Sequence, residues 1–496
     1  MKTGPHPQLV PSDYGQVRLP GLGSVINGQL RSNGPEFTCE NPANGQTICV
    51  LSSATEGDVH DAILAARSAF EGAWGLMSPG KRQKILSKLA RLIEDHLDEL
   101  ALLESTENGI PLMVVRNFSV AALAKNIAYY ASWIDKLHGS VVPLTTKDAL
   151  DYVVTEPFGV VGVVTAYNTP SLFLGSKVGP ALAAGNCVVI KPSPYASLPA
   201  LRFAELVSEA GLPDGAVNVV LGGAEVGSQL AGHSLVDLLS FTGSGRAGRQ
   251  VSELAAANLT PVALELGGKS PDIVFEDADI AKASTSACLG AFALSGQACV
   301  AGSRLLVHRS IKDQLIESLV KFTESLPVGN PQDPGTVIGP LISASHRDWV
   351  ESIISRSVDE GAQIVCGATR PNGNLSNGYY LYPGVISNVR QVQDIYRQEV
   401  FGPVITVSTF ESENEAVVMG NDTNYGLGAG IWTRDIGRAH RVASRLRAGS
   451  VWINSYGVVP HVAPFGGYKD SGSAREGGIW GLMTYLQHKN IYVDLK

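Results

Sequence analysis

The chain has 496 residues, which is enough for roughly three units of domain size. Apolar residues make up 44% of it and charged residues 17%, the balance of an ordinary globular protein with ample material for a large core. The formal net charge is −8 and no block of lysines and arginines interrupts it, so the composition argues against a nucleic acid or an anionic membrane surface as a partner.

The N-terminal region, residues 1 to about 36, is rich in glycine, proline and polar residues, and we expect an extended arm there. Its first residues contain no apolar stretch of the kind found in a secretory signal, so we expect a cytoplasmic protein. Two long amphipathic helices follow. One begins at a capping box formed by Thr55 and Asp58, and the other begins at Ser78 and Pro79 and runs to about residue 105.

From Phe158 onward, β-branched runs alternate with helical patterns. A strand at 159–167 precedes a helix at 171–184, and further strands read CVVIK, VNVVL and DLLSF. This alternation predicts an α/β fold with a parallel sheet covered by helices on both faces. A second α/β unit follows, with strands at RLLVH, PVITVSTF and SVWIN. The alternating tail KNIYVDL predicts a last strand, whose partner edge could lie on another subunit.

The most apolar segment, residues 172–190, is not expected to span a membrane. Ser176, Lys177 and Asn186 interrupt it, and its pattern favours a buried helix followed by a strand.

A glycine-rich turn follows the strand DLLSF. Gly243, Gly245 and Gly248 in FTGSGRAGR match the spacing G-x-G-x-x-G, which suits a phosphate at a helix N-terminus but also suits a tight turn without a ligand. The lysine and hydroxyl residue of a P-loop are absent, which argues against nucleoside triphosphate chemistry. Glu265 lies near the spacing of a ribose-binding acid, yet its place between an apolar strand and Gly-Gly equally suits a buried base.

A single cysteine, Cys299, sits among small residues in SGQACVAG, residues 295–302. It could be a nucleophile kept free of obstruction or a small buried residue in a tight turn. Six cysteines without a C-x-x-C spacing are too sparse for a disulfide scaffold in a chain of this length, so we expect reduced thiols.

Several short segments agree with one another in order along the chain. They are NPANGQ from Asn41, KVGPALAAGN from Lys177, LELGGKSP from Leu264, SGQACVAGSR from Ser295, QEVFGPV from Gln398, PFGGYKDSG from Pro464 and SGSAREGG from Ser471. Together they resemble the signatures of the NAD(P)-dependent aldehyde dehydrogenases of the non-acylating type, which carry both a cysteine and a glutamate motif. The resemblance is collinear from about Ile26 to the C-terminus.

The resemblance implies two α/β domains and a small β element for oligomerisation. The NAD(P)-binding domain, a Rossmann variant, is expected at 1–132 and 156–265, and the catalytic domain at 266–465. The oligomerisation element is expected at 133–155 and 466–496, which implies a homodimer or homotetramer.

The resemblance also implies the catalytic residues. Adding a nucleophile to an aldehyde gives a tetrahedral alkoxide that can expel hydride, and Cys299 matches the family nucleophile. Asn168 and the Cys299 backbone N–H match the oxyanion donors. Glu265 matches the base that activates water to hydrolyse the thioester. Lys177 and Glu476 match positions that steer or relay protons, although a structural ion pair would have the same sequence.

NAD is the implied cofactor, and no metal is implied. The matching positions are Thr165, Lys191, Ser193, Gly243, Ser244, Gly248, Leu266, Gly267, Glu399 and Phe401. Many relatives that prefer NAD have a glutamate where Pro194 stands, and that carboxylate repels the 2′-phosphate of NADP. We therefore expect NAD use with NADP accepted.

By alignment with the family, six positions line the substrate channel. They are Thr169, Phe173, Ser176, Val300, Val459 and Phe465. Ser176 and Val459 are small where some relatives are aromatic, which favours a branched or aromatic aldehyde. Tyr167 replaces the usual tryptophan before the oxyanion asparagine.

Three alternatives remain. A CoA-acylating dehydrogenase is disfavoured by Glu265, and an inert structural or binding member is disfavoured by the joint presence of Cys299, Glu265 and Asn168. A Cys-His hydrolase lacks a recognisable partner motif for any of its ten histidines.

Overall fold

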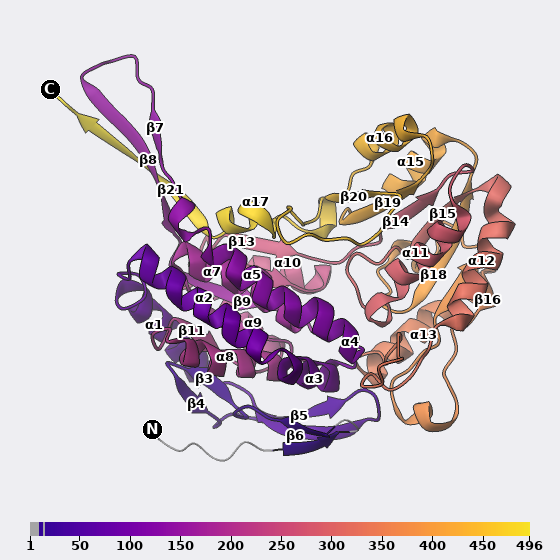
Figure 1. Ribbon diagram of the computed structural model, residues 1–496, viewed down its shortest axis with the longest axis horizontal. Helices are drawn as coiled ribbons and strands as arrows, with labels where there is room; N and C mark the ends of the chain where they lie inside the picture. Colours follow the sequence, from indigo (N-terminus) through magenta and orange to yellow (C-terminus); the bar gives the residue numbers. More distant parts are fainter. Residues whose placement is uncertain (1–8, 13–14) are drawn as a thin grey trace.

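A computed structural model describes residues 9–12 and 15–496, and its framework is a pair of seven-stranded sheets (Figure 1). The first sheet has the order β13-β12-β9-β10-β11-β3-β4 and the second the order β16-β17-β18-β15-β14-β19-β20. Strands of the first sheet are β3 (Ser24–Ile26), β4 (Gln29–Arg31), β9 (Val160–Val164), β10 (Cys187–Lys191), β11 (Val217–Val219), β12 (Leu238–Thr242) and β13 (Val262–Glu265). Strands of the second are β14 (Pro271–Val274), β15 (Arg304–His308), β16 (Gln363–Cys366), β17 (Gly384–Ser387), β18 (Val404–Phe410), β19 (Gly428–Trp432) and β20 (Ser450–Ile453).

The expected α/β class is confirmed in both sheets. The strands from β13 to β11 pair in parallel, as do those from β17 to β20. Strands β9 and β10 are buried along their whole length, as their β-branched runs require. Helices α1, α7, α8 and α9 pack on the first sheet, and α11, α12, α15 and α16 pack on the second.

The helices cover most of the expected positions. They are α1 (Glu56–Glu71), α2 (Pro79–Asp95), α3 (Leu97–Asn108), α4 (Leu112–Val114), α5 (Ala121–Ala131), α6 (Pro170–Phe173), α7 (Gly179–Ala184), α8 (Leu198–Ala210), α9 (Ala224–Ala231), α10 (Gly245–Ala256), α11 (Ile280–Phe292), α12 (Lys312–Ser325), α13 (Ala344–Asp359), α14 (Asp394–Arg397), α15 (Glu413–Asn421), α16 (Ile436–Arg445) and α17 (Gly478–Met483). Two π-helical turns, η1 (Val115–Val120) and η3 (Leu174–Val178), interrupt this set, and short 3₁₀ turns lie at η2 (Ile134–Lys136), η4 (Ala293–Gly296), η5 (Arg309–Ile311), η6 (Gly373–Asn377) and η7 (Lys469–Ser471). The capping box of Thr55 and Asp58 is present at the start of α1. Over the residues that the structure describes, no helix is long and apolar enough to cross a membrane.

One expectation about the N-terminal region is wrong. The extended arm was expected to reach residue 36, but β3 and β4 form a hairpin that joins the first sheet, with Val25 opposite Val219. Burial of Ile26 in the hydrophobic core beside that sheet stabilises the hairpin in this position. Nearer the terminus, β1 (Leu9–Ser12) pairs with β2 (Gly15–Arg18), whereas residues 1–8 and 13–14 of the expected arm lie outside the described residues.

The helix expected at 78–105 is two helices. Chain direction changes at His96, which has φ −106° and ψ 19° and lies between α2 and α3. Both α2 and α3 pack against α8.

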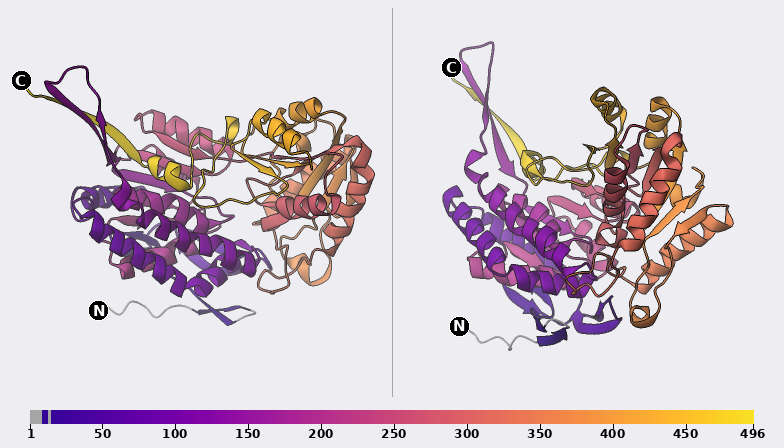
Figure 2. Two further views of the ribbon diagram at one scale, coloured as in Figure 1. Left: turned by 45° about the horizontal axis from the view of Figure 1, so that its top comes forward. Right: turned by 45° about the vertical axis from the view of Figure 1, so that its right-hand side comes forward.

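The C-terminal strand finds its partner within the same chain. Strand β21 (Leu486–Asp494) pairs antiparallel with β8 (Ala149–Pro157), which in turn pairs with β7 (Ser140–Val142). This three-stranded sheet projects from the body of the molecule (Figures 1 and 2). The partner edge of β21 therefore lies on its own chain, and no other strand among the described residues pairs with its second edge. Elsewhere, β5 (Glu36–Asn41) and β6 (Gln46–Ser52) form a separate two-stranded ribbon.

The first sheet gathers candidate residues at one edge. Thr165 follows β9, Lys191 ends β10, Gly243 follows β12 and Glu265 ends β13. Because neighbouring strands here are parallel, their carboxyl ends meet at the same edge, which is where open α/β sheets bind ligands.

Candidate active site

The loop before Cys299 has an unusual backbone. Leu294, Ser295 and Gly296 have φ angles of 55°, 58° and 75°, a left-handed run that side chains other than glycine disfavour. A Cβ at Gly296 would lie 2.1 Å from the backbone carbon of Gly402, so only glycine fits there. The loop is thus forced against the segment that carries Glu399, and the small residues of SGQACVAG have a structural reason.

Gln297 holds this loop in place, although it was not predicted as a site residue. Its Nε2 donates to the Leu294 carbonyl at 3.2 Å, and its Oε1 accepts the Ile342 N–H at 3.0 Å. Its own carbonyl accepts a hydrogen bond from Asn168 Nδ2 at 2.8 Å. Because Asn168 has two amide hydrogens, the second stays available to a substrate oxyanion beside Cys299. The signal in the sequence was an amide side chain within a motif of otherwise small residues.

The thiol of Cys299 is held in its protonated form in the protein alone. Burial raises the pKa of Cys299 to about 12, and the carboxyls of Glu399 and Glu265 add to the rise. A hydrogen bond from the Val300 backbone N–H acts in the opposite direction on the same pKa. A thiolate at neutral pH therefore needs a base to take the proton or a positive charge nearby.

Glu265 is a buried carboxyl at the end of β13. Neither of its oxygens has a hydrogen-bond partner among the described residues. Burial raises the pKa of Glu265 well above its usual range, and the nearby Glu476 raises it further, while Lys177 and Arg475 oppose the shift. An unpaired buried carboxyl is costly, so it points to a water or substrate as its partner.

Lys177 and Glu476 form a buried ion pair close to this carboxyl. Lys177 Nζ lies 2.7 Å from Glu476 Oε1 and also donates to Ser240 Oγ at 3.3 Å. The Ser240 hydroxyl in turn lies 3.0 Å from the hydroxyl of Tyr485. A chain of polar groups thus leads from the neighbourhood of Glu265 toward the start of β21, and Ser240 and Tyr485 were not predicted from sequence.

The glycine turn has the expected strand–turn–helix form. Ser244 caps α10, and its side-chain oxygen accepts the Ala247 N–H at 3.3 Å. A Cβ at Gly248 would lie 2.7 Å from the Leu266 side chain, so the helix packs closely on the segment after β13. The free amides at the start of α10 suit a phosphate.

Lys191 ends β10 and Ser193 follows that strand, which β9 separates from β12, the strand before the turn. Lys191 is buried at the end of β10, and burial lowers its pKa to about 8. The Thr165 N–H donates to the Lys191 carbonyl at 3.2 Å, which ties the ends of β9 and β10 together. Ser193 is buried and its hydroxyl accepts the Tyr195 N–H at 3.3 Å.

Glu399 reaches the same side of the site from the second sheet's domain. Its Oε1 accepts the Gly268 N–H at 3.0 Å, and a Cβ at Gly267 would lie 2.0 Å from its Oε2. Burial raises the pKa of Glu399 to about 7, and the Gly268 N–H and Lys269 oppose the rise.

Phe401 follows in a left-handed conformation, with φ 55°. Its ring meets that of Tyr167 edge to face, with centroids 5.9 Å apart. His346 Nε2 donates to the Phe401 carbonyl at 2.7 Å and supports this strained residue. His346 is a further position that sequence reasoning missed.

These groups have the chemistry that a dinucleotide requires. A lysine ammonium, a helix N-terminus and a carboxyl come from the end of β10, the start of α10 and the loop at 398–403. The residues present therefore fit an NAD-type cofactor.

The six predicted channel residues differ in how deeply their side chains are buried. Thr169, Phe173 and Ser176 are buried, and the Ser176 hydroxyl has no partner among the described residues. Val300 and Phe465 are half-buried, and the backbone of Phe465 pairs with that of Glu476. Val459 is 40% exposed, so it lies at the surface end of this set.

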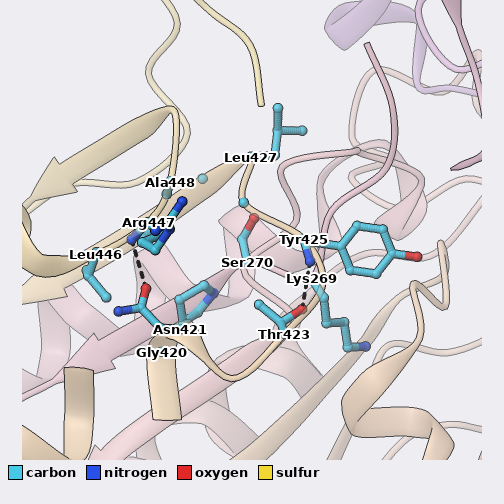
Figure 3. Close-up of a pocket in the computed structure, with 14 residues that line it drawn as sticks. Lys269, Ser270, Gly420, Asn421, Thr423, Tyr425, Leu427, Leu446, Arg447 and Ala448 are labelled. Atoms are coloured by element: carbon cyan, nitrogen blue, oxygen red, sulfur yellow. Dashed lines mark hydrogen bonds between the residues drawn. The ribbon is translucent and has the colours of Figure 1, made fainter. Parts of the chain in front are cut away.

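A separate small cavity lies in the second sheet's domain (Figure 3). Its lining includes Lys269, Ser270, Asn421, Tyr425 and Arg447. None of the predicted catalytic or substrate residues lines it.

Comparison with known proteins identifies the family. The model of the Aldehyde dehydrogenase family matches residues 30–491. The chain belongs to the aldehyde dehydrogenase family. It is 43% identical over 459 residues to betaine aldehyde dehydrogenase of Bacillus subtilis (strain 168), covering 92% of this chain and 94% of the relative. It is 40% identical over 477 residues to the NADP/NAD-dependent aldehyde dehydrogenase PuuC of Escherichia coli (strain K12), covering 95% of each chain.

Solved structures agree with this assignment. Betaine aldehyde dehydrogenase from Staphylococcus aureus in complex with NAD+ superposes with a TM-score of 0.94 at 39% identity, over 96% of this chain and 95% of that one. A putative aldehyde dehydrogenase from Burkholderia cenocepacia also gives 0.94 at 40% identity, over 96% and 98%. The predicted fold and family are therefore confirmed, and this aldehyde dehydrogenase is an NAD(P)-dependent oxidoreductase that oxidises aldehydes.

Proposed function

We propose that this aldehyde dehydrogenase forms an acyl-enzyme on Cys299 and releases the acid with water activated by Glu265. The observation that carries the proposal is the buried carboxyl of Glu265, which has no hydrogen-bond partner among the described residues. This carboxyl also raises the pKa of the Cys299 thiol. A structural carboxyl at this depth would have hydrogen-bond partners within the protein.

In the first half of the reaction, Cys299 loses its thiol proton to solvent, and its sulfur attacks the aldehyde carbon to give the oxyanion of a thiohemiacetal. The free N–H of Asn168 and the Cys299 backbone N–H stabilise the oxyanion. NAD+ supplies the acceptor for the hydride that leaves this carbon. A thioester on Cys299 remains.

In the second half, Glu265 takes a proton from water as the water attacks the thioester. The acid then leaves and Cys299 regains its thiol. The Lys177–Glu476 pair lies beside Glu265 and can carry the proton onward toward Ser240.

Two variants test these roles. Cys299→Ser is expected to lower kcat by about 10⁴-fold, because a neutral hydroxyl is a far weaker nucleophile. Glu265→Gln is expected to keep a single burst of NADH and to lose steady turnover. Unchanged turnover in either variant contradicts its proposed role.

The pH dependence of thioester hydrolysis tests Glu265 further. Its folded pKa lies well above the usual range, so the fraction of ionised base rises as pH rises through that raised value. We expect the rate of thioester hydrolysis in the wild-type enzyme to increase with pH across neutrality. In Glu265→Gln we expect this increase to be absent.

For the cofactor, we propose NAD with NADP also accepted. The proposed contacts are Lys191 and Ser193 at the adenosine ribose, Gly243, Ser244 and Gly248 at the pyrophosphate, Glu399 and Phe401 at the nicotinamide ribose, and Thr165, Leu266 and Gly267 along the binding cleft. Pro194 brings no carboxylate to repel a 2′-phosphate. The ratio of kcat/KM for the two cofactors tests this, and Pro194→Glu should raise the preference for NAD. A strict NAD preference in the wild type would contradict it.

For the substrate, we propose a hydrophobic, branched or aromatic aldehyde. Support comes from the buried Phe173, the small Ser176 and Val459, and the absence of a charged side chain among the six channel positions. A panel of aldehydes with both cofactors tests this. Preference for acetaldehyde or for a charged semialdehyde contradicts it.

We also propose a cytoplasmic homodimer or homotetramer, assembled through an oligomerisation element at 133–155 and 466–496. The cofactor domain is proposed at 1–132 and 156–265 and the catalytic domain at 266–465. The projecting sheet exposes Val141, Leu150 and Tyr492, which favours a covering subunit. Light scattering of the purified enzyme tests the assembly, and a monomer contradicts it.

A CoA-acylating reaction is the second candidate. It would leave Glu265 without a task, because CoA rather than water would take the acyl group. Product analysis with and without CoA separates the two reactions.

A further inference from the structure

Tyr456 lies outside every predicted site, yet its hydroxyl reaches the nucleophile loop. The residue is buried three positions after β20, and its O–H donates to the Val300 carbonyl at 2.8 Å. Val300 follows Cys299 directly, and its backbone N–H acts to lower the pKa of the Cys299 thiol. One residue therefore connects the tyrosine hydroxyl to the thiol.

The Tyr456 ring sits in a slot made by three glycines. A Cβ at Gly290, Gly302 or Gly430 would lie 2.7, 2.9 or 2.6 Å from an atom of the ring. The Trp452 ring packs on it as well, with centroids 4.9 Å apart. Gly290 belongs to α11 and Gly430 to β19, so the ring is anchored between regular elements of the domain. An anchor confined in this way can hold a backbone carbonyl at a constant position.

We propose that Tyr456 is a positioning residue for the nucleophile: its hydroxyl holds the Val300 carbonyl and thereby fixes the backbone that directly follows Cys299. The inference rests on the proposed role of Cys299. An N–H that lowers the pKa of the thiol stabilises the thiolate, so a fixed backbone here favours the attacking form. Gln297 restrains the same loop on the other side of Cys299, through Ile342 and Asn168.

The variant Tyr456→Phe tests the inference, because it keeps the ring between the glycines and removes only the hydroxyl. The matched control is Tyr380→Phe, at another buried tyrosine, to which we assign no contact with the nucleophile loop. For each variant we would measure the alkylation rate of Cys299 by iodoacetamide from pH 6 to 10, following the Cys299 peptide by mass spectrometry. Steady-state kcat and the KM for NAD+ complete the set.

For Tyr456→Phe we expect the alkylation profile to move to higher pH and kcat to fall about tenfold, with the KM for NAD+ unchanged within about twofold. Tyr380→Phe should match the wild type in all three. A merely structural role would lower thermal stability and leave the alkylation profile in place. A Tyr456→Phe profile identical to the wild type overturns the inference.

The variant Cys299→Ser distinguishes failure of the proposed function from failure of the proposed role of Tyr456. If Cys299→Ser keeps dehydrogenase activity, the proposed function itself fails. If Cys299→Ser is inactive while Tyr456→Phe retains wild-type alkylation and kcat, only the role of Tyr456 fails.

Discussion

The nucleophile loop at 294–300 and the glycine turn at 243–248 are both built from small residues, but they are held in different ways. The glycine turn is stabilised locally, since Ser244 caps its helix through a residue three positions away. The nucleophile loop is stabilised from a distance. Its contacts reach Gly339, Ile342, Asn168 and Tyr456, which are 44 to 156 positions away.

The difference also appears in the backbone. The loop contains consecutive left-handed residues, Leu294 to Gly296, and such strain persists only when the surroundings over-determine it. The turn needs no strain at Ser244, whose φ and ψ are −71° and 151°. Changes in the loop should therefore affect catalysis strongly, and changes in the turn should affect cofactor binding weakly.

The largest effect is expected from Gly296→Ala. Its Cβ would lie 2.1 Å from Gly402 backbone, which cannot rotate away as a side chain could. We expect kcat to fall by about 100-fold or more, because a displaced loop moves Cys299 away from Asn168. Kinetics together with the melting temperature check this. Activity within twofold of the wild type would show that the surrounding contacts do not hold the loop in a single conformation.

Gln297→Met should have the next largest effect. It leaves the Ile342 N–H without its acceptor while keeping a side chain of similar volume, which costs about 1–3 kcal/mol of stability. We expect kcat to fall about tenfold, with little change in the KM for NAD+. Chemical unfolding and steady-state kinetics measure the two effects. A change in KM alone would contradict a role in holding the nucleophile loop.

Gly248→Ala is the matched change in the turn. Its Cβ would approach the Leu266 side chain at 2.7 Å, and a leucine can shift at modest cost. We expect the KM for NAD+ to rise a few-fold and kcat to change less than twofold. An effect on kcat as large as that of Gly296→Ala would remove the contrast between the two regions.

Ser244→Ala should have the smallest effect. Losing an N-cap hydroxyl costs about 1 kcal/mol, and Ser244→Gly should cost only a few tenths. Thermal unfolding of the two variants measures this order. Equal losses would show that the hydroxyl of Ser244 does not cap α10.

Sequence reasoning succeeded where the determinants are local. The capping box at Thr55 and the strand–turn–helix at Gly243 are encoded within a few residues of each position and were predicted correctly. It failed at His96, where the pattern of apolar residues continues although the helix does not. It also failed at Ser24–Arg31, whose strands exist because a distant sheet offers them an edge.

The candidate site shows the same division. The residue types at Cys299, Glu265 and Asn168 stand out in short motifs, and the family resemblance supplied their expected roles. Tyr456, Ser240 and His346 have no such signal, because each forms its hydrogen bond with a partner at least 55 positions away.

The sequence by itself determined the class of fold and the family, and it led to the proposed reactive groups, because periodicity, turn chemistry and short motifs are local properties. The tertiary structure decided the rest. Only packing shows that the Glu265 carboxyl is buried without a partner, that the Cys299 thiol is held protonated by burial, and that β21 pairs within its own chain. These properties arise from desolvation and from contacts between distant segments, which spacing along a chain does not encode.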